Sequence, residues 1–127
     1  MIDTCFLIDY QRESKQRAPG IVVDFLKAHA EERLQISPVA WGEFLAGFEH
    51  EHDPFIDFAR DRLDFAPLAP EIASTYREIY RYLKTTGNLI GANDLWIASH
   101  AIASKQALIT RDSSDFLRVP GLRVIRY

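Results

Sequence analysis

A chain of 127 residues is long enough to bury a hydrophobic core as one domain, and its formal net charge of −3 argues mildly against a non-specific nucleic-acid binder, which usually carries a basic excess. Its 47% hydrophobic and 26% charged residues suit a globular protein, and no apolar run approaches the roughly 20 residues that cross a bilayer. The single cysteine, Cys5, excludes an internal disulfide and a multi-cysteine zinc site, and the acidic first stretch is unlike a signal peptide, so we expect one domain over residues 1–127, located in the cytoplasm without a membrane partner.

The first half of the chain predicts short strands that alternate with helices. A very short strand precedes Asp3 and runs into a turn or helix, and apolar spacing predicts a helix within residues 21–33. Residues 33–37 form a strand candidate. The pair Ser37–Pro38, a good N-cap followed by a good first helical residue, opens a helix over 38–48.

The second half continues the same alternation. One helix is expected after Pro54 and another from Pro70, and residues 94–103 predict a helix that is apolar nearly all round and therefore buried. Strands are predicted at 107–110 and 122–127. Short apolar strands between helices imply a mostly parallel central sheet covered on both faces, so the predicted fold class is α/β, a three-layer α/β/α sandwich.

Acidic residues fall at the junctions where such a sheet forms its sites, beyond the carboxyl ends of the strands. Asp3 ends the first strand, and Glu43 lies in the first turns of the helix that follows the second. Asp94 opens the buried helix, Asp112 follows the next strand by one residue, and Asp115 is a possible fifth acid.

Each acid also has a purely structural interpretation. Asp94 could satisfy free amides and the dipole at the start of its helix, and Asp112 could be an ordinary turn residue. Glu43 is harder to explain in this way, because a capping box from Ser37 would place its acid at the position of Ala40. Small residues share the helix face of Glu43, which indicates the close approach of another element.

As a set, the acids predict a metal site. Carboxylates gathered a few ångströms apart raise each other's pKa unless something compensates their charge. Without histidine or cysteine at these junctions, an all-oxygen site suits Mg²⁺ or Mn²⁺ rather than zinc. Such cations activate water and stabilise the leaving oxygen of a phosphodiester, and they offset the acidic charge locally.

The motifs around these acids resemble a known family. DT at Asp3–Thr4, SPVAWGEFLAGF around Glu43, GANDLWIASHA around Asp94 and LITRDSSDF around Asp112 are similar to blocks of the PIN domain, most of all in the VapC group of bacterial toxin–antitoxin ribonucleases. The resemblance runs in order over nearly the whole chain, and the last two blocks together are fairly specific. The chain departs from the family in its few apolar residues before Asp3 and in Cys5, where Asn or Ser is usual; neither departure removes a ligand.

The resemblance implies Mg²⁺- or Mn²⁺-dependent cleavage of single-stranded segments of structured RNA, such as tRNA or ribosomal RNA. It assigns metal binding and catalysis to four acids, namely Asp3, Glu43, Asp94 and Asp112. It makes Asp115 an auxiliary acid and gives Thr4 the role of orienting groups near the metal. It also implies a homodimer that is inhibited by a small VapB-like antitoxin.

Several basic residues are candidate RNA contacts. Arg77, Arg81 and Lys84 follow one another at helical spacing, which predicts a basic ridge that either contacts RNA or is simply a solvated face. Arg111, beside Asp112, is a better candidate for the scissile phosphate, although it could equally pair with a surface acid.

Other functions stay open at this point. A Mg²⁺-dependent small-molecule phosphohydrolase would often carry a second aspartate two residues after the first, where this chain has Cys5. A catalytically silent PIN-like binding module would be indicated by loss of one or more acids, and all four are present. A receiver domain would want adjacent acids early in the chain and a lysine closing a later strand, and neither stands at the expected place.

Overall fold

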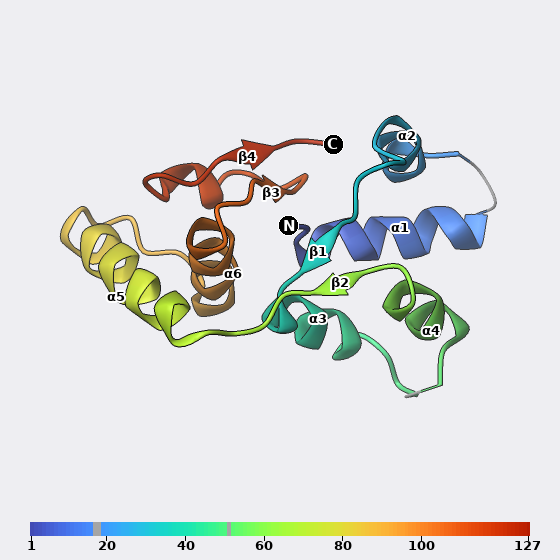
Figure 1. The fold of residues 1–127 in the computed structure, drawn as a ribbon, viewed down its shortest axis with the longest axis horizontal. Helices are drawn as coiled ribbons and strands as arrows, with labels where there is room; N and C mark the ends of the chain where they lie inside the picture. The colour runs from blue at the N-terminus through green and yellow to red at the C-terminus, as the bar shows by residue number, and fades with distance from the viewer. Residues whose placement is uncertain (17–18, 51) are drawn as a thin grey trace.

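The computed structural model describes residues 1–16, 19–50 and 52–127, and it alternates helices with very short strands (Figure 1). The elements in chain order are α1 (Thr4–Gln16), α2 (Ile21–Ala28), β1 (Gln35–Ile36), α3 (Pro38–Leu45), α4 (Pro54–Arg60), β2 (Asp64–Phe65), α5 (Pro70–Thr85), α6 (Ala92–Ala103), β3 (Leu108–Ile109), the 3₁₀ turn η1 (Phe116–Arg118) and β4 (Val124–Ile125). Within the described ranges, no helix is both long enough and apolar enough to span a membrane.

The strands pair in parallel, as predicted. β1 pairs with β2, and β3 pairs with β4. Between these pairs lies Ile2, which forms parallel bridges to Ile36 of β1 and Ile109 of β3. The spatial order is therefore β2, β1, Ile2, β3, β4, so the strand predicted before Asp3 is a single bridging residue at the centre of the sheet.

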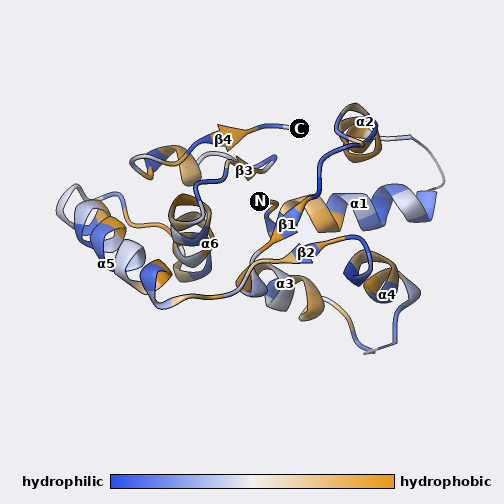
Figure 2. Ribbon diagram, viewed as in Figure 1, coloured by the Kyte–Doolittle hydropathy of each residue, from blue (hydrophilic) through white to orange (hydrophobic). Residues whose placement is uncertain are grey.

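Helices pack to both sides of these strands. α5 packs against α6 on one side, and α1 with α2 lies on the other, while α3 contacts both α1 and α6 (Figure 1). α1 is hydrophobic at its start, where it enters the core, and hydrophilic toward its end (Figure 2). This arrangement brings the first turns of α1, α3 and α6 near one another.

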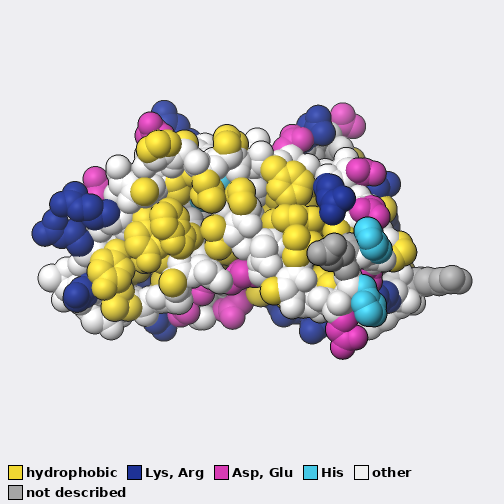
Figure 3. Space-filling model, turned by 90° about the horizontal axis from the view of Figure 1, so that it is seen from below, with side chains coloured by type: hydrophobic (Ala, Val, Ile, Leu, Met, Phe, Trp, Pro, Cys, Tyr) yellow, Lys and Arg dark blue, Asp and Glu magenta, His cyan; other side chains and the backbone are white. Residues whose placement is uncertain are grey.

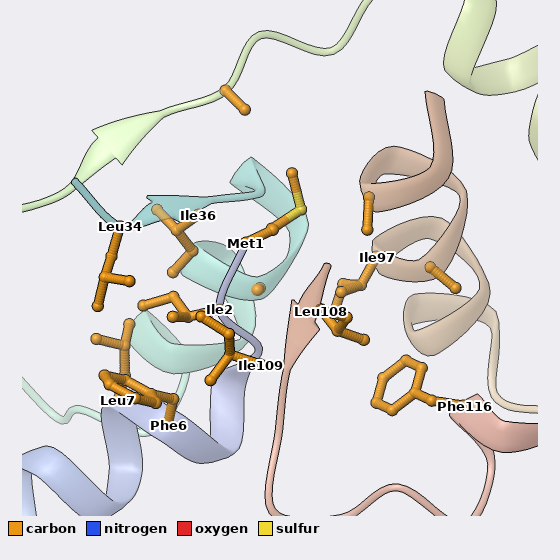
Figure 4. Close-up of a cluster of buried hydrophobic side chains, with 14 of the residues drawn as sticks. Met1, Ile2, Phe6, Leu7, Leu34, Ile36, Ile97, Leu108, Ile109 and Phe116 are labelled. Atoms are coloured by element: carbon orange, nitrogen blue, oxygen red, sulfur yellow. The ribbon is translucent and has the colours of Figure 1, made fainter. Parts of the chain in front are cut away.

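The hydrophobic core surrounds the central residue of the sheet. Ile2 is fully buried beside Ile36 and Ile109. Figure 4 shows Leu7 of α1 on one side of these residues and Ile97 of α6 toward the other. Because two-residue strands provide few backbone hydrogen bonds, we infer that packing around Ile2 contributes much of the stability that holds the sheet together.

The start of α3 is fastened to α6. Ser37 is the N-cap, as predicted, and its Oγ accepts a hydrogen bond from the Val39 amide at 3.2 Å. The same Oγ lies 3.1 Å from Nδ1 of His100 in α6, and both residues are buried. Burial lowers the pKa of His100, which favours a neutral core histidine. This contact couples the helix that carries Glu43 to the helix that carries Asp94.

Two predictions need correction. The predicted helix over 38–48 is shorter, because α3 ends at Leu45, and the helix predicted from Asp94 begins two residues earlier, at Ala92. Asp94 therefore follows helix α5 and a connector, so it is not at the end of a strand.

Candidate metal centre

The predicted acids meet in one pocket of about 280 Å³. It is lined by the five acids Asp3, Glu43, Asp94, Asp112 and Asp115, together with Thr4, Cys5, Ile8, Ile97 and Phe116. These residues come from the start of α1, from α3, from the first two turns of α6 and from the segment between β3 and η1. The fold thus gathers carboxylates that are far apart in the sequence.

Asp3 is the most buried acid of the pocket. Its Oδ1 accepts a hydrogen bond from the Phe6 amide at 3.0 Å, and its Oδ2 accepts one from the Thr110 hydroxyl at 2.5 Å. Burial raises the pKa of Asp3, the nearby charge of Asp112 adds to that effect, and the hydrogen bonds oppose it. The carboxylate is therefore held in a fixed orientation at the end of the central strand.

Glu43 is held between two helices. The Thr4 hydroxyl at the start of α1 donates to its Oε2 at 2.5 Å, and the Asn93 amide of α6 donates to its Oε1 at 2.6 Å. The Thr4 hydroxyl also lies 3.4 Å from the carbonyl oxygen of Ala40, a fully buried residue one turn before Glu43. The small residue thus permits the close approach that the sequence indicated.

Asp94 does not cap its helix. The N-cap of α6 is Gly91, which makes no side-chain capping bond, and Asp94 is the third helical residue, with no hydrogen bond from the described residues to its carboxylate. A Cβ on Gly91 would lie 3.2 Å from Asp94 Oδ2, so the glycine leaves room for the carboxylate. Burial, followed by the charges of Glu43, Asp115, Asp3 and Asp112, raises the pKa of Asp94 to about 6.

Asp112 fits both of its interpretations. Its Oδ1 accepts hydrogen bonds from the Ser114 amide at 3.3 Å and the Ser114 hydroxyl at 3.0 Å, as a turn aspartate does. It also lines the pocket. Asp115 lines the pocket too, while one of its oxygens lies 3.4 Å from the Arg118 guanidinium.

Comparison with known proteins decides the family. The PIN domain model matches residues 1–122. The chain belongs to the PIN domain family.

Individual relatives of this PIN-domain chain are VapC proteins. Ribonuclease VapC2 of Rickettsia felis is 37% identical over 89 residues, which are 70% of this chain and 66% of the relative. Ribonuclease VapC1 of Methanocaldococcus jannaschii is 30% identical over 111 residues, which are 83% of this chain and 82% of the relative. The predicted resemblance to the VapC group is thereby confirmed.

A solved structure supports the fold as well. The crystal structure of VapBC2 from Rickettsia felis bound to a promoter DNA fragment contains a chain that superposes with a TM-score of 0.85 at 26% identity, covering 100% of this chain and 97% of that one. The predicted α/β fold class is confirmed.

Two residues that orient acids of this PIN-domain site were not predicted from the sequence. Asn93 donates to Glu43, and Thr110 donates to Asp3. Each stands at the end of an element beside a predicted acid, Asn93 directly before Asp94 and Thr110 two residues before Asp112. A polar residue close to a predicted acid was the signal available in the sequence. Which acid Asn93 or Thr110 contacts depends on the fold.

The Cys5 thiol lies at the pocket but is not prepared for nucleophilic attack. Burial raises the pKa of Cys5 to about 11, and the charge of Asp3 adds to the effect while that of Arg111 opposes it. A thiol with this pKa is protonated at neutral pH, and the thiolate is the reactive form.

The predicted RNA-contacting residues lie outside the pocket lining. Arg77, Arg81 and Lys84 are exposed on α5, where the Lys84 ammonium lies 5.7 Å from the centre of the Tyr80 ring. Arg111 forms an ion pair with Asp9 at 2.8 Å, so it does pair with an acid, but that acid is buried and not at the surface as the alternative interpretation had it.

The donor set of the pocket fits a hard divalent cation. All of its charged groups are carboxylates, and their charges add to the larger effect of burial in raising the pKa of Asp94 to about 6. The side chains do not form a closed cage, because among the described residues no three His, Cys, Asp or Glu side chains are arranged to hold a metal ion. The carboxylates of Asp3 and Glu43 are each engaged by their own hydrogen-bond donors instead. A cation would be held by Asp3 and Asp94, with Glu43 and Asp112 nearby.

Replacing Asp94 by Asn is expected to stabilise the metal-free protein above pH 6. The fold raises the pKa of Asp94 from its ordinary 3.8 to about 6, so ionisation of Asp94 lowers folding stability as the pH rises through that interval. After allowance for partial exposure and the helix dipole, the gain is about 1 kcal/mol at pH 8 and vanishes below about pH 4. Urea unfolding in chelator across this pH range measures it.

The matched control is Asp57→Asn, which removes an exposed acid ion-paired with Arg60 on α4. It should show no pH-dependent gain of this size. A loss of stability in Asp94→Asn at every pH would restore the capping interpretation.

Proposed function

We propose that residues 1–127 form one PIN nuclease domain that acts as a Mg²⁺- or Mn²⁺-dependent endoribonuclease, a VapC-like toxin. Its substrates are single-stranded regions of structured RNA such as tRNA or ribosomal RNA. The observation that carries the proposal is the convergence of five acids on one pocket, one of them with a pKa raised to about 6. The names of the relatives, ribonucleases VapC1 and VapC2, support the substrate class.

The residues of the chain prepare the pocket for phosphodiester hydrolysis. When bound, the divalent cation would supply an activated water and stabilise charge on the leaving oxygen. Asp3 is oriented by Thr110 and the Phe6 amide, and Glu43 has each carboxylate oxygen bound to a different donor. This preorganisation means that the ligands lose little freedom when the site fills. The expected products carry a 5′ phosphate and a 3′ hydroxyl.

RNA would approach over basic residues outside the pocket. Arg77, Arg81 and Lys84 form an exposed ridge on α5 that can neutralise backbone phosphates despite the acidic net charge. Arg111 keeps an exposed fraction of 55% while paired with Asp9, so part of its guanidinium can reach a phosphate beside Asp112.

A homodimer would cover an apolar surface. Apolar side chains gather on the face seen from below, under α5, the segment that leads into it, and α3 (Figure 3). On that segment Leu68 is 50% exposed, and on the strand before it Phe65 is 40% exposed. The Phe65 ring packs edge-on against Trp41, with 5.2 Å between the ring centres. An exposed surface of this kind is favourable to bury against a second copy.

A VapB-like antitoxin would occupy a different face. An apolar pocket of about 200 Å³ lies where α1 and α2 meet the end of α4, and its lining includes Tyr10, Leu26 and Leu63. Such a pocket accepts an apolar anchor of a partner helix. The VapBC complexes among the similar structures support this partner class.

Cleavage of RNA is expected to depend on the pocket acids. With Mg²⁺ or Mn²⁺, the wild-type chain should cut total tRNA or ribosomal RNA into discrete fragments, and Asp94→Asn or Glu43→Gln should reduce the rate at least about 100-fold, as should excess chelator. Asp24→Asn, which removes an exposed acid on α2, is the control and should cleave normally. End-labelling identifies the 5′ phosphate. RNA binding without cleavage would indicate the catalytically silent binding module. Hydrolysis of p-nitrophenyl phosphate without cleavage of RNA would indicate the small-molecule phosphohydrolase.

The same assay tests the ridge on α5. The triple variant Arg77→Ala, Arg81→Ala, Lys84→Ala should raise KM for RNA several-fold with kcat unchanged, because phosphate contacts contribute binding that is equal in the ground and transition states. Unchanged KM would make these residues a solvated face.

Sedimentation equilibrium tests the homodimer. The wild-type chain should sediment as a dimer, and Leu68→Arg should dissociate it because a charge in an apolar interface is desolvated without a partner. A monomeric wild type would contradict the proposal.

The antitoxin pocket is tested by escape from inhibition. Leu63→Glu should cleave RNA as the wild type does but resist the proposed VapB-like antitoxin, since a carboxylate replaces apolar lining. Equal inhibition of both proteins would place the antitoxin elsewhere.

A further inference from the structure

Asp9 is a buried acid that the proposed chemistry leaves unused. It lies in the second turn of α1, is 7% exposed, and is absent from the lining of the acidic pocket. Nη1 of Arg111 lies 3.0 Å from its Oδ1 and 2.8 Å from its Oδ2, and the Tyr127 hydroxyl donates to Oδ2 at 3.0 Å. The largely exposed Arg12 is more distant, with its Nη1 3.6 Å from Oδ1. A buried carboxylate is costly unless it is paired, so these contacts hold Arg111 firmly against α1.

Arg111 stands in the middle of a segment that leads into the metal centre. Before it, the buried Thr110 donates to Asp3 at 2.5 Å, and after it Asp112 lines the pocket. Two consecutive residues are thus fastened to acids at or near the start of α1, Thr110 to Asp3 and Arg111 to Asp9. The third residue, Asp112, directly follows these two attached residues, and its side chain lines the pocket.

The chain after Asp112 is held at Ser113, which is buried and whose Oγ accepts a hydrogen bond from Arg126 Nε at 2.7 Å, but these contacts do not reach the Asp112 carboxylate. The hydrogen bonds to that carboxylate come from Ser114, which belongs to the same exposed turn and would move together with it. The Thr110 hydroxyl lies 3.1 Å from the Asp112 carbonyl oxygen. The link from Asp9 to Arg111 anchors the residue directly before Asp112 to α1, as the bond from Arg126 anchors Ser113 directly after it.

We propose that Asp9 is a positioning residue of the metal centre, and that through its ion pair with Arg111 it holds the Asp112 carboxylate in place beside Asp3. This inference rests on the proposed function and adds a residue to it. Asp9 touches neither substrate nor metal; it acts only through the segment 110–112. The Tyr127 hydroxyl donates to the same carboxylate, which satisfies Asp9 without linking it to the segment 110–112.

The test is Mn²⁺ binding, measured by calorimetry on the full chain. Asp9→Asn and Arg111→Ala should each raise the Kd about tenfold, as residues that orient metal ligands do. The double variant should bind about as weakly as either single variant, because both substitutions break the same link. Asp94→Asn should abolish binding, which establishes that the measured ion occupies the acidic pocket.

Tyr127→Phe is the matched control. It removes the other hydrogen bond to Asp9 and leaves Arg111 paired, so it should lower the melting temperature while the Kd for Mn²⁺ stays within about twofold of wild type. Near-UV circular dichroism confirms that each variant is folded. A merely structural role of Asp9 would lower the melting temperature without changing the Kd.

Three results would overturn the inference. Unchanged binding in Asp9→Asn would show that the pair does not position the ligand. Weaker binding in Asp9→Asn with normal binding in Arg111→Ala would show that Arg111 is not the link. If the wild-type chain itself bound no Mn²⁺, the metal centre of the proposed function would fail together with this inference, whereas the first two results leave the proposed function intact.

Discussion

Carboxylates confined to one small pocket repel each other, and most features of the site limit or use that repulsion. Asp3 and Glu43 have hydrogen-bond donors on both carboxylate oxygens, from Thr110 and the Phe6 amide in one case and Thr4 and Asn93 in the other. Asp94 has no such hydrogen bonds from the described residues, and burial together with the neighbouring carboxylates raises its pKa to about 6. The fold thus holds an electrostatic cost that a divalent cation would relieve.

Very short strands and well-packed helices hold the acids together despite this electrostatic cost. Only one residue, Ile2, forms the central strand, yet it bridges both halves of the sheet and is immediately followed by Asp3. The buried contact between Ser37 and His100 ties the start of α3, the helix of Glu43, to the later part of α6, the helix of Asp94. The same residues that build the core therefore set the distances between the acids, which makes core packing and site geometry difficult to change separately.

The proposed interactions use different faces of the protein around the pocket. The basic ridge lies on α5, the apolar pocket is bordered by α1 and α2, and the exposed apolar residues Phe65 and Leu68 lie on β2 and on the connector to α5. A nuclease toxin must bind RNA while remaining open to inhibition, and separate faces allow each contact to form without occupying the acids themselves. The pair of Asp9 and Arg111 connects the first helix with the turn that carries Asp112.

The sequence by itself determined the alternation of helices with short strands, the Ser37 cap and the acids that would meet, but not strand β2. These follow from local periodicity, from turn chemistry and, for Asp3 and Asp112, from the rule that parallel strands end at one edge, whereas Asp94 follows helix α5 and a connector. Only the tertiary structure decided how each acid is used. It excluded Asp94 as a cap, and it joined Thr4 to Glu43 across 39 residues, Thr110 to Asp3 across 107 and Arg111 to Asp9 across 102. Such pairs depend on the angles and distances at which helices pack, and no local propensity of the chain encodes them.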